Sequence, residues 1–270
     1  PLFIWMQALS MKLFGVNEFA ARFPNAICGI LTLLLLFNIG KNRGDERFGL
    51  LWVIMYGASF LPFFYFKSGI IDPWFNLFIF LGIYFFSLYA DPGQVEKRMS
   101  NSALSALFIG LGILTKGPVA LLIFLLTFGE YLIYRRFRFE FRCRDVLVYV
   151  AVLSVVGGAW FILLIANGNY SVIQDFIAYQ IRLFQTQDAG HGGIFLYHFV
   201  ILFLGVFPAA IFAISAFRKS TVKGEKNREL AEMFRWMMIS FWVVLILFTI
   251  VKTKIVHYSS FCYFPLTFLA

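Results

Sequence analysis

Long apolar runs separated by short polar segments dominate this chain. A helix that spans a membrane needs about 20 mostly apolar residues, with a range of about 17–25. Uninterrupted runs indicate helices, because a transmembrane barrel shows short segments of alternating polarity instead. We therefore predict an all-α, polytopic transmembrane helical bundle with about eight complete spans and one truncated span. The predicted segments are Phe19–Ile39, Phe48–Phe66, Trp74–Ala90, Ala103–Thr115, Gly117–Tyr134, Val146–Ala166, Ile194–Phe217, Trp236–Val251 and Ser259–Ala270.

Three stretches need separate interpretations. Ala103–Thr115 is short for a span, and it fits only if other helices shelter it or if it extends into the preceding polar loop. Residues 1–18 are predicted to form an interfacial juxtamembrane helix. Residues 167–193 are predicted to be an external loop. The chain opens without a starting Met and stops inside an apolar run, so we expect residues 1–270 to be a single transmembrane domain truncated at both ends.

The composition supports a membrane protein. The chain is 61% hydrophobic and 14% charged, whereas a soluble domain is about half apolar and about a quarter charged. The net charge of +9 would suit nucleic acid. However, the basic residues cluster in loops between apolar runs, so topology explains them and no nucleic-acid partner is expected. The three cysteines show neither disulfide placement nor metal-ligand spacing.

The basic residues divide unequally between alternate loops. Of the 23 Lys and Arg residues, 16 lie in one set of loops and 7 in the other. Because Lys and Arg are enriched on the cytoplasmic side of membrane proteins, the richer set is predicted to be cytoplasmic. That set comprises the basic residues at 41–47, 97–98, 135–144 and 218–235. The opposite loops, which contain the candidate residues below, are then external.

Two ionisable residues of the predicted external face adjoin spans. Asp72 stands directly before a span and is followed by Pro73, so it is either a helix N-cap or a carboxylate at the mouth of a membrane cavity. Lys116 lies in the tight turn Leu114–Pro118. It is either a lysine that snorkels to the interface or one that points into a polar cavity.

The predicted external loop holds two further candidates. Arg182 has the planar fork that clamps a phosphate, although it can equally pair with Asp175 or Asp188. His191 lies beside two glycines that permit close approach to a ligand. A surface histidine without a ligand is the commoner case.

The turn Lys252–Tyr258 has the most unusual composition. Lys252 and Lys254, spaced by one residue, precede His257 and Tyr258 on the side where Lys and Arg are scarce. Lys and Tyr are also common interfacial anchors. An anchor does not need this combination, whereas a phosphate or pyrophosphate would be bound by it. The turn therefore predicts an anion held at the membrane surface.

Several short motifs follow one another in a definite order along the chain. They are Pro1–Trp5, Lys12–Glu18, Ala21–Pro24, Leu114–Pro118, Asp188–His191, Phe195–Tyr197 and the Lys-x-Lys-x-x-x-Tyr turn Lys252–Tyr258 with Pro265. Together they resemble the bacterial lipid-linked-sugar glycosyltransferases of the GT-C superfamily, which include the aminoarabinose transferase acting on lipid A and relatives of protein O-mannosyltransferases. The resemblance runs the length of the chain. Each motif alone is weak, but their order and shared external face make the match specific.

The resemblance implies a GT-C enzyme that moves a sugar from a polyprenyl-phosphate donor to a lipid, glycan or protein acceptor. It places this enzyme in the bacterial inner membrane, among membrane lipids, with its active site facing the periplasm. The family's catalytic base lies in a first external loop that would precede Pro1, and Asp72 matches the second acidic position and is our catalytic candidate. The implied substrate-binding residues are Lys116, Arg182, His191, Tyr197, Lys252, Lys254, His257 and Tyr258.

The resemblance also bears on metals and cofactors. Some relatives carry a histidine just before the arginine of the long loop, whereas this chain has Tyr179 and Gln180 there. No bound metal is therefore predicted from that loop. Because the leaving group is a lipid phosphate, no cofactor is expected either.

Two other classes remain open. A transporter or flippase for an anionic lipid-linked sugar would also need external cations, but it should show charges deep within spans or a broken-helix pair near the midplane. Lys116 falls at the external end of a span rather than deep within it, so a transporter or flippase is kept only as the alternative to the enzyme. A non-catalytic membrane subunit is the third. An Asp-rich external loop before Pro1 would favour the enzyme.

Overall fold

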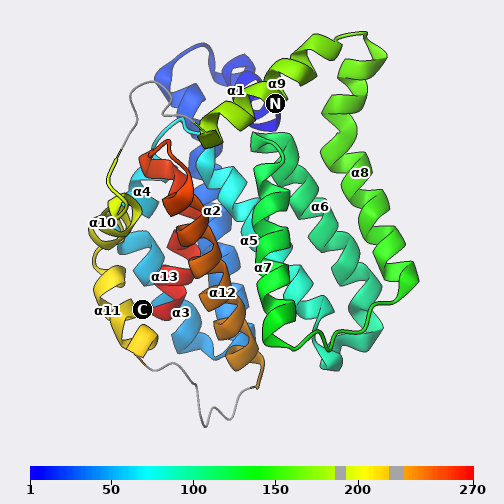
Figure 1. Ribbon diagram of the computed structural model, residues 1–270. Coiled ribbons are helices and arrows are strands. Elements are labelled where there is room, and N and C mark those ends of the chain that lie inside the picture. Colours follow the sequence, from blue (N-terminus) through cyan, green and yellow to red (C-terminus); the bar gives the residue numbers. More distant parts are fainter. Residues whose placement is uncertain (186–192, 219–227) are drawn as a thin grey trace.

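A computed structural model describes residues 1–185, 193–218 and 228–270, and every regular element in these ranges is a helix. The longer helices run roughly along one axis and form a bundle (Figure 1). This confirms the predicted all-α helical bundle. The first elements are α1 (Leu2–Phe14), α2 (Glu18–Arg43), α3 (Glu46–Ala58), α4 (Phe60–Phe66), α5 (Asp72–Tyr89), the 3-10 helix η1 (Pro92–Lys97), α6 (Arg98–Lys116) and α7 (Val119–Tyr134). The later elements are α8 (Cys143–Ala166), α9 (Tyr170–Gln185), α10 (Tyr197–Gly205), α11 (Ala209–Arg218), α12 (Arg228–Ile250), the 3-10 helix η2 (Val256–Cys262) and α13 (Tyr263–Leu269).

Length and apolar composition identify the helices that can cross a membrane. Among the described residues, α2, α8 and α12 qualify singly. Three bent pairs also qualify if each pair is counted as one span: α3 with α4 at 77°, α5 with η1 and α6 at 110°, and α10 with α11 at 117°. The described chain therefore has three such spans, or up to six, and it is a multi-pass membrane protein.

Two segments predicted as continuous spans are each divided into two helices. Phe48–Phe66 is interrupted at Ser59, whose backbone is extended between α3 and α4. Ile194–Phe217 is interrupted between α10 and α11 at Pro208, which has no N–H with which to continue a helix. Continuous apolar composition therefore did not reveal either break.

The two breaks face each other and satisfy each other's backbone groups. The Phe60 N–H donates to the Phe207 carbonyl over 3.2 Å. The Ser59 hydroxyl lies 2.6 Å from the Met55 carbonyl oxygen in α3 and 3.2 Å from the Val206 carbonyl oxygen. Backbone groups at membrane depth need protein partners because no water is available to them. Each break therefore makes the other possible.

The limits of three further helices bear on the predictions. α6 begins at Arg98, so the short segment Ala103–Thr115 does extend into the preceding polar stretch and reaches 19 residues. Helix α1 agrees with the helix predicted within residues 1–18, and its place at the interface stays a prediction. Residues 167–193 contain the 16-residue helix α9. This connection is therefore partly helical, and its external position stays a prediction.

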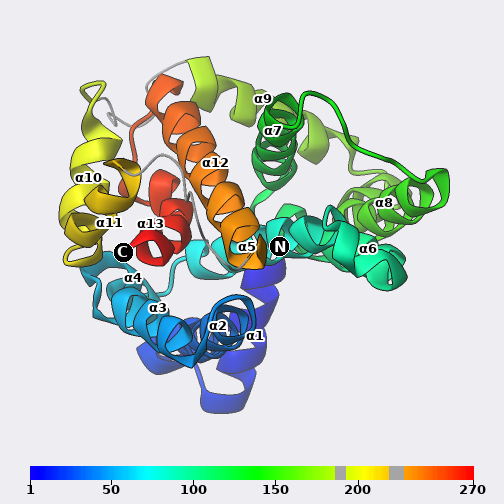
Figure 2. The same ribbon diagram turned by 90° about the horizontal axis from the view of Figure 1, so that it is seen from below.

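Helices α5 and α12 occupy the middle of the bundle. Viewed along the axis, α2 and α3 lie on one side of them, α10 and α11 on another, and α6 and α8 on a third (Figure 2). The short α13 packs against α3, α11 and α12. α8 packs on α6 and leaves most of its apolar side chains outside the protein, which suits a helix that faces lipid.

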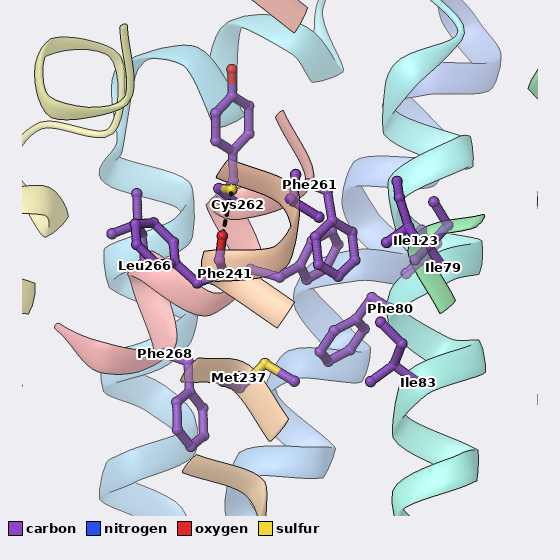
Figure 3. Close-up of a cluster of buried hydrophobic side chains, with 14 of the residues drawn as sticks. Ile79, Phe80, Ile83, Ile123, Met237, Phe241, Phe261, Cys262, Leu266 and Phe268 are labelled. Carbon is purple, nitrogen blue, oxygen red and sulfur yellow. Dashed lines mark hydrogen bonds between the residues drawn. The ribbon is translucent and has the colours of Figure 1, made fainter. Parts of the chain in front are cut away.

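The core joins α5, α12 and the C-terminal helices. Its side chains interleave between these helices (Figure 3), with Phe80 stacked on Phe264 at a centroid distance of 4.5 Å. The buried Trp52 of α3 donates through its indole N–H to the Thr267 hydroxyl of α13 over 3.2 Å. This packing of large apolar side chains fixes α5, on whose first turn the site depends.

The two ends of the bundle differ in charge. At one end Arg43, from the last turn of α2, pairs with Glu229 of α12 over 2.8 Å. Arg98, at the start of α6, donates to the Glu140 carbonyl over 2.8 Å. We call this the basic end. Helices α1 and α9 lie across the opposite end (Figure 1), which we call the cavity end.

Candidate functional site

A cavity of about 650 Å³ lies at the cavity end. The first turns of α5, the α6–α7 turn, the outer part of α8, one face of α9 and the turn after α12 enclose it. Its apolar lining includes Ile113, Ile123, Trp160, Phe161, Leu164, Phe176 and Phe261. Its polar lining includes Asp72, Asn76, Lys116, Gln180, His257 and Tyr258. A large apolar pocket with a few convergent polar groups is the usual form of a ligand site, and this one suits an amphiphile.

The centre of the polar lining is an ion pair between Asp72 and Lys116. The Lys116 ammonium donates to the Asp72 carboxylate over 2.6 Å, with side-chain exposures of 23% and 3%. Asp72 is the first residue of α5 and Ile71 occupies the N-cap position, so the N-cap interpretation of Asp72 does not hold. Lys116 lines the cavity, as one of its two interpretations expected, although the cavity is largely apolar around it.

Aromatic rings complete the surroundings of Lys116. Its ammonium lies 5.5 Å from the ring centroids of both Phe75 and Tyr258. A cation within about 6 Å of a ring face is attracted by the ring quadrupole. The charge is thus held from α5 on one side and from the turn after α12 on the other.

Side chains of α2 hold the connection that leads into Asp72. The buried Asn25 donates from its amide nitrogen to the carbonyls of Ser68 (2.7 Å) and Ile70 (2.6 Å). The indole N–H of Trp74 donates to the Pro24 carbonyl over 3.1 Å. Since these bonds lie on both sides of Asp72 in the chain, they fix the position of its carboxylate.

The turn that carries Lys116 requires glycine at its next position. Gly117 has φ +100° and its N–H donates to the Ile113 carbonyl over 2.8 Å, which ends α6. A Cβ atom on Gly117 would lie 2.7 Å from Cζ of Phe176 in α9. Only glycine has both the backbone freedom and the small size needed here. The Lys116 turn and α9 are therefore in direct contact.

The two lysines of the turn after α12 have different surroundings. Lys252 is exposed, whereas Lys254 is buried and donates to the Phe248 carbonyl (3.0 Å) and the Thr249 carbonyl (2.6 Å). Lys254 thus satisfies carbonyls at the C-terminus of α12, where the helix dipole favours a cation. Burial lowers the pKa of Lys254. Neither lysine lines the cavity, but His257 and Tyr258 of the same turn do.

Arg182 and Tyr197, two of the remaining predicted residues, lie outside the cavity lining. Arg182 is exposed on α9, with its guanidinium 5.2 Å from the ring centroid of Tyr179, and Tyr179 lines the cavity. Tyr197 begins α10 and packs edge-on against His198 at 5.2 Å. His191 falls within residues 186–192, outside the described part of the chain.

Sequence reasoning missed several cavity residues. On α9 the lining side chains are Val172, Ile173, Phe176, Tyr179 and Gln180. Their spacing follows one face of a helix, so this periodicity could have identified α9 and its cavity-facing side. Asn76 lies one helical turn after Asp72 and had no comparable signal, because it is a single polar residue in an apolar run.

In residues 1–185, 193–218 and 228–270, no three His, Cys, Asp or Glu side chains come together as a possible metal site. Where some relatives carry a histidine, just before Arg182, this chain has Tyr179 and Gln180, and both side chains line the cavity.

The fold and this site define a class, that of helical multi-pass membrane proteins with a ligand cavity at one end of the bundle. Residues 1–168, more than half of the chain, match the family described as dolichyl-phosphate-mannose-protein mannosyltransferase. The chain belongs to this family. The GT-C resemblance noted from its motifs is confirmed.

Relatives of known name cover the chain almost completely. It is 26% identical over 268 residues to the undecaprenyl phosphate-alpha-4-amino-4-deoxy-L-arabinose arabinosyl transferase of Photorhabdus laumondii, covering 98% of this chain and 47% of the relative. The transferase of the same name from Aeromonas hydrophila is 26% identical over 267 residues, covering 98% and 48%. The chain thus spans about half the length of these relatives.

A solved structure shares the fold. The crystal structure of ArnT from Cupriavidus metallidurans bound to undecaprenyl phosphate aligns with a TM-score of 0.86 at 19% sequence identity. The alignment covers 100% of this chain and 48% of that one. At this identity the likeness shows the fold alone.

Proposed function

We propose that the protein containing this chain is a membrane glycosyltransferase that transfers a sugar from a polyprenyl-phosphate donor to a lipid acceptor. Family membership supports the reaction class, and the arabinosyl transferases among the relatives support a pentose attached to undecaprenyl phosphate. The chain spans about half the length of these relatives. The proposal therefore concerns the whole protein.

The observation that carries this proposal is the Asp72–Lys116 pair within an otherwise largely apolar cavity. Apolar side chains suit a prenyl tail, and an ammonium group suits the phosphate at its end. Lys116 has three N–H donors. It can thus bind a phosphate oxygen while it remains bonded to Asp72.

The proposed reaction is a displacement at C1 of the sugar. The bond from C1 to the phosphate oxygen breaks, a bond from C1 to an acceptor oxygen forms, and polyprenyl phosphate leaves with the electron pair. Lys116 stabilises the negative charge that develops on the phosphate. Asp72 orients the acceptor hydroxyl and takes its proton. The upstream acidic residue implied by the resemblance is the other candidate for this base.

The other predicted residues have different roles in this proposal. His257 and Tyr258 contact the donor, because they line the cavity beside Lys116. Arg182 and Lys252 are exposed and act at the rim, where they attract the anionic donor. Lys254 supports the turn through the α12 carbonyls. For Tyr197 we propose a contact with the donor or acceptor outside the cavity. For His191, which falls outside the described residues, we propose a contact with the donor or acceptor.

The proposed orientation puts the cavity end on the periplasmic side of the inner membrane. Arg43 and Arg98 lie at the basic end, which would face the cytoplasm under the rule that Lys and Arg are enriched there. A periplasmic cavity would receive its sugar attached to a lipid carrier, because such a carrier brings the sugar across the membrane before the transfer. Cysteine labelling of the full-length protein with an impermeant maleimide tests this orientation. A cysteine at Lys252 should be labelled from outside, and one at Lys97 should not.

Transfer of radiolabelled sugar tests the activity. Full-length protein in lipid nanodiscs receives undecaprenyl-phosphate-linked 4-amino-4-deoxy-L-arabinose and lipid A. Product is expected from the wild type and not from the Asp72→Asn or Lys116→Met variants, whereas the Lys12→Met variant, altered on α1 away from the cavity lining, should retain activity. Movement of the donor across the bilayer without any transfer would instead support a flippase.

A further inference from the structure

A short chain of hydrogen bonds connects α5 to the turn that carries His257. The Asn76 amide nitrogen donates to the Ser260 hydroxyl over 2.8 Å, and the Ser260 hydroxyl donates to the His257 carbonyl over 2.5 Å. Asn76 and Ser260 are 4% and 1% exposed. The Asn76–Ser260 bond is buried and the Ser260–His257 bond is partly buried, so water competes with the first bond little. They hold His257 and Tyr258 in place against α5.

The direction of these two hydrogen bonds determines how the Asn76 amide is oriented. The His257 carbonyl can only accept a hydrogen bond, so the single proton of the Ser260 hydroxyl is directed to it. The Ser260 oxygen must then accept from Asn76, which requires the NH₂ group rather than the carbonyl oxygen at that position. The Asn76 carbonyl oxygen, Oδ1, therefore points elsewhere.

The Oδ1 atom of Asn76 is placed to meet a ligand. Asn76 lies four residues after Asp72, one helical turn along the same face of α5, and it lines the cavity. Oδ1 accepts no hydrogen bond from the described residues, and it is not among the buried polar atoms that lack a partner. Its exposure is therefore to the cavity, beside the Asp72–Lys116 pair.

We propose that Asn76 is a substrate-contacting residue that accepts a hydrogen bond through Oδ1 from a hydroxyl or ammonium group of the donor sugar or of the acceptor. The inference rests on the proposed glycosyltransferase function. A carbonyl oxygen binds such donors and offers nothing to a phosphate, which has only acceptor oxygens when ionised. Asn76 thus selects the group being transferred or its acceptor, while Lys116 binds the phosphate.

The test separates this contact from the structural bond to Ser260. Asn76→Ala removes both the Oδ1 acceptor and the bond to Ser260. Ser260→Ala removes only the link to the turn and leaves Oδ1 in place. Full-length protein in nanodiscs is titrated with undecaprenyl phosphate and, separately, with undecaprenyl-phosphate-linked 4-amino-4-deoxy-L-arabinose. Asn101→Ala and Ser240→Ala serve as controls, because both residues are buried and neither lines the cavity.

Asn76→Ala is expected to bind the sugar-bearing lipid about three- to tenfold more weakly than Ser260→Ala does, the size of one hydrogen bond. Both variants should bind undecaprenyl phosphate equally. If the difference appears instead only in kcat/KM for the acceptor, Oδ1 contacts the acceptor. Equal effects of the two substitutions on both lipids and on kcat/KM would overturn the proposal. A wild type that binds neither lipid would contradict the proposed function itself.

Protein stability is measured on the same samples. If Asn76→Ala unfolds, Asn76→Leu provides the second variant, since it has a similar size and no Oδ1. It should bind the sugar-bearing lipid about three- to tenfold more weakly than Ser260→Ala does. Affinity equal to that of Ser260→Ala would contradict a role as acceptor.

Discussion

The Lys116 ammonium lies 2.6 Å from the Asp72 carboxylate, although 44 residues separate them in the chain. Each residue stands at the end of a helix that faces the cavity. The pair has a structural and a chemical role in the proposed enzyme, and single and double substitutions distinguish the two.

Loss of one partner should destabilise the protein more than loss of both. Asp72→Asn leaves the Lys116 charge without its counterion, and we expect a loss of about 2–3 kcal/mol. That is less than the 3–5 kcal/mol typical of fully buried pairs, because the Lys116 side chain is 23% exposed. The double variant with Lys116→Met should regain much of this stability, while transfer stays absent. Thermal unfolding in detergent measures the first effect. Equal melting temperatures for single and double variants would argue against a coupled pair.

Gly117→Ala should separate the Lys116 turn from α9. Gly117 has φ +100° and ψ −169°, a region adopted almost only by glycine, and an alanine there costs on the order of 1–3 kcal/mol. Displacement of the Phe176 ring adds about 1–3 kcal/mol. Gly168→Ala is a matched control, since Gly168 also has a positive φ of +73° but a Cβ there would have no neighbour within 4 Å. The unfolding free energy of the Gly168→Ala variant should fall only by the cost of placing an alanine at a positive φ. Adding Phe176→Ala should restore part of the Gly117→Ala loss. Identical losses at the two glycines would rule out the ring contact.

The two lysines of the Lys252–Tyr258 turn should differ in their effect on stability. Lys254→Met deprives two buried carbonyls of their donor, and each unsatisfied group costs about 1–3 kcal/mol. Lys252→Met alters an exposed side chain and should change the unfolding free energy by less than about 0.5 kcal/mol. Chemical denaturation of the purified variants measures both. A large loss at Lys252 with none at Lys254 would reverse this assignment.

Ser59→Ala should weaken the contact between the two helix breaks. The Ser59 hydroxyl lies 2.6 Å from the Met55 carbonyl oxygen and 3.2 Å from that of Val206, which also accepts from the Ala210 N–H. We therefore expect a loss of about 1 kcal/mol, the size of one hydrogen bond. Ser240→Ala is the control, because the Ser240 hydroxyl bonds to the Met237 carbonyl within its own helix. Hydrogen exchange at Phe60, whose N–H bonds to the Phe207 carbonyl, should accelerate only in the first variant. Unchanged exchange there would show that the breaks are held by other contacts.

Local pattern sufficed for some elements and not for others. The length that a span needs predicted that Ala103–Thr115 is either sheltered by other helices or extended, and α6 does begin earlier, at Arg98. The spacing of Val172, Phe176 and Tyr179 carries the signal of a helix, although we predicted a loop there. The break at Ser59 was not legible, because serine is tolerated within helices. The backbone bond across this break joins the Phe60 N–H to the Phe207 carbonyl, which is distant in the chain.

The sequence by itself determined that this is a helical membrane protein with basic loops at one end, because hydrophobic length and charge act locally along the chain. It also identified Asp72, Lys116 and the Lys252–Tyr258 turn as unusual. Only the tertiary structure decided that Asp72 pairs with Lys116, that Lys254 holds the end of α12, and that Asn76 reaches the cavity. Side-chain partners at buried sites depend on how helices pack, and packing is a property of surfaces that only folding brings together.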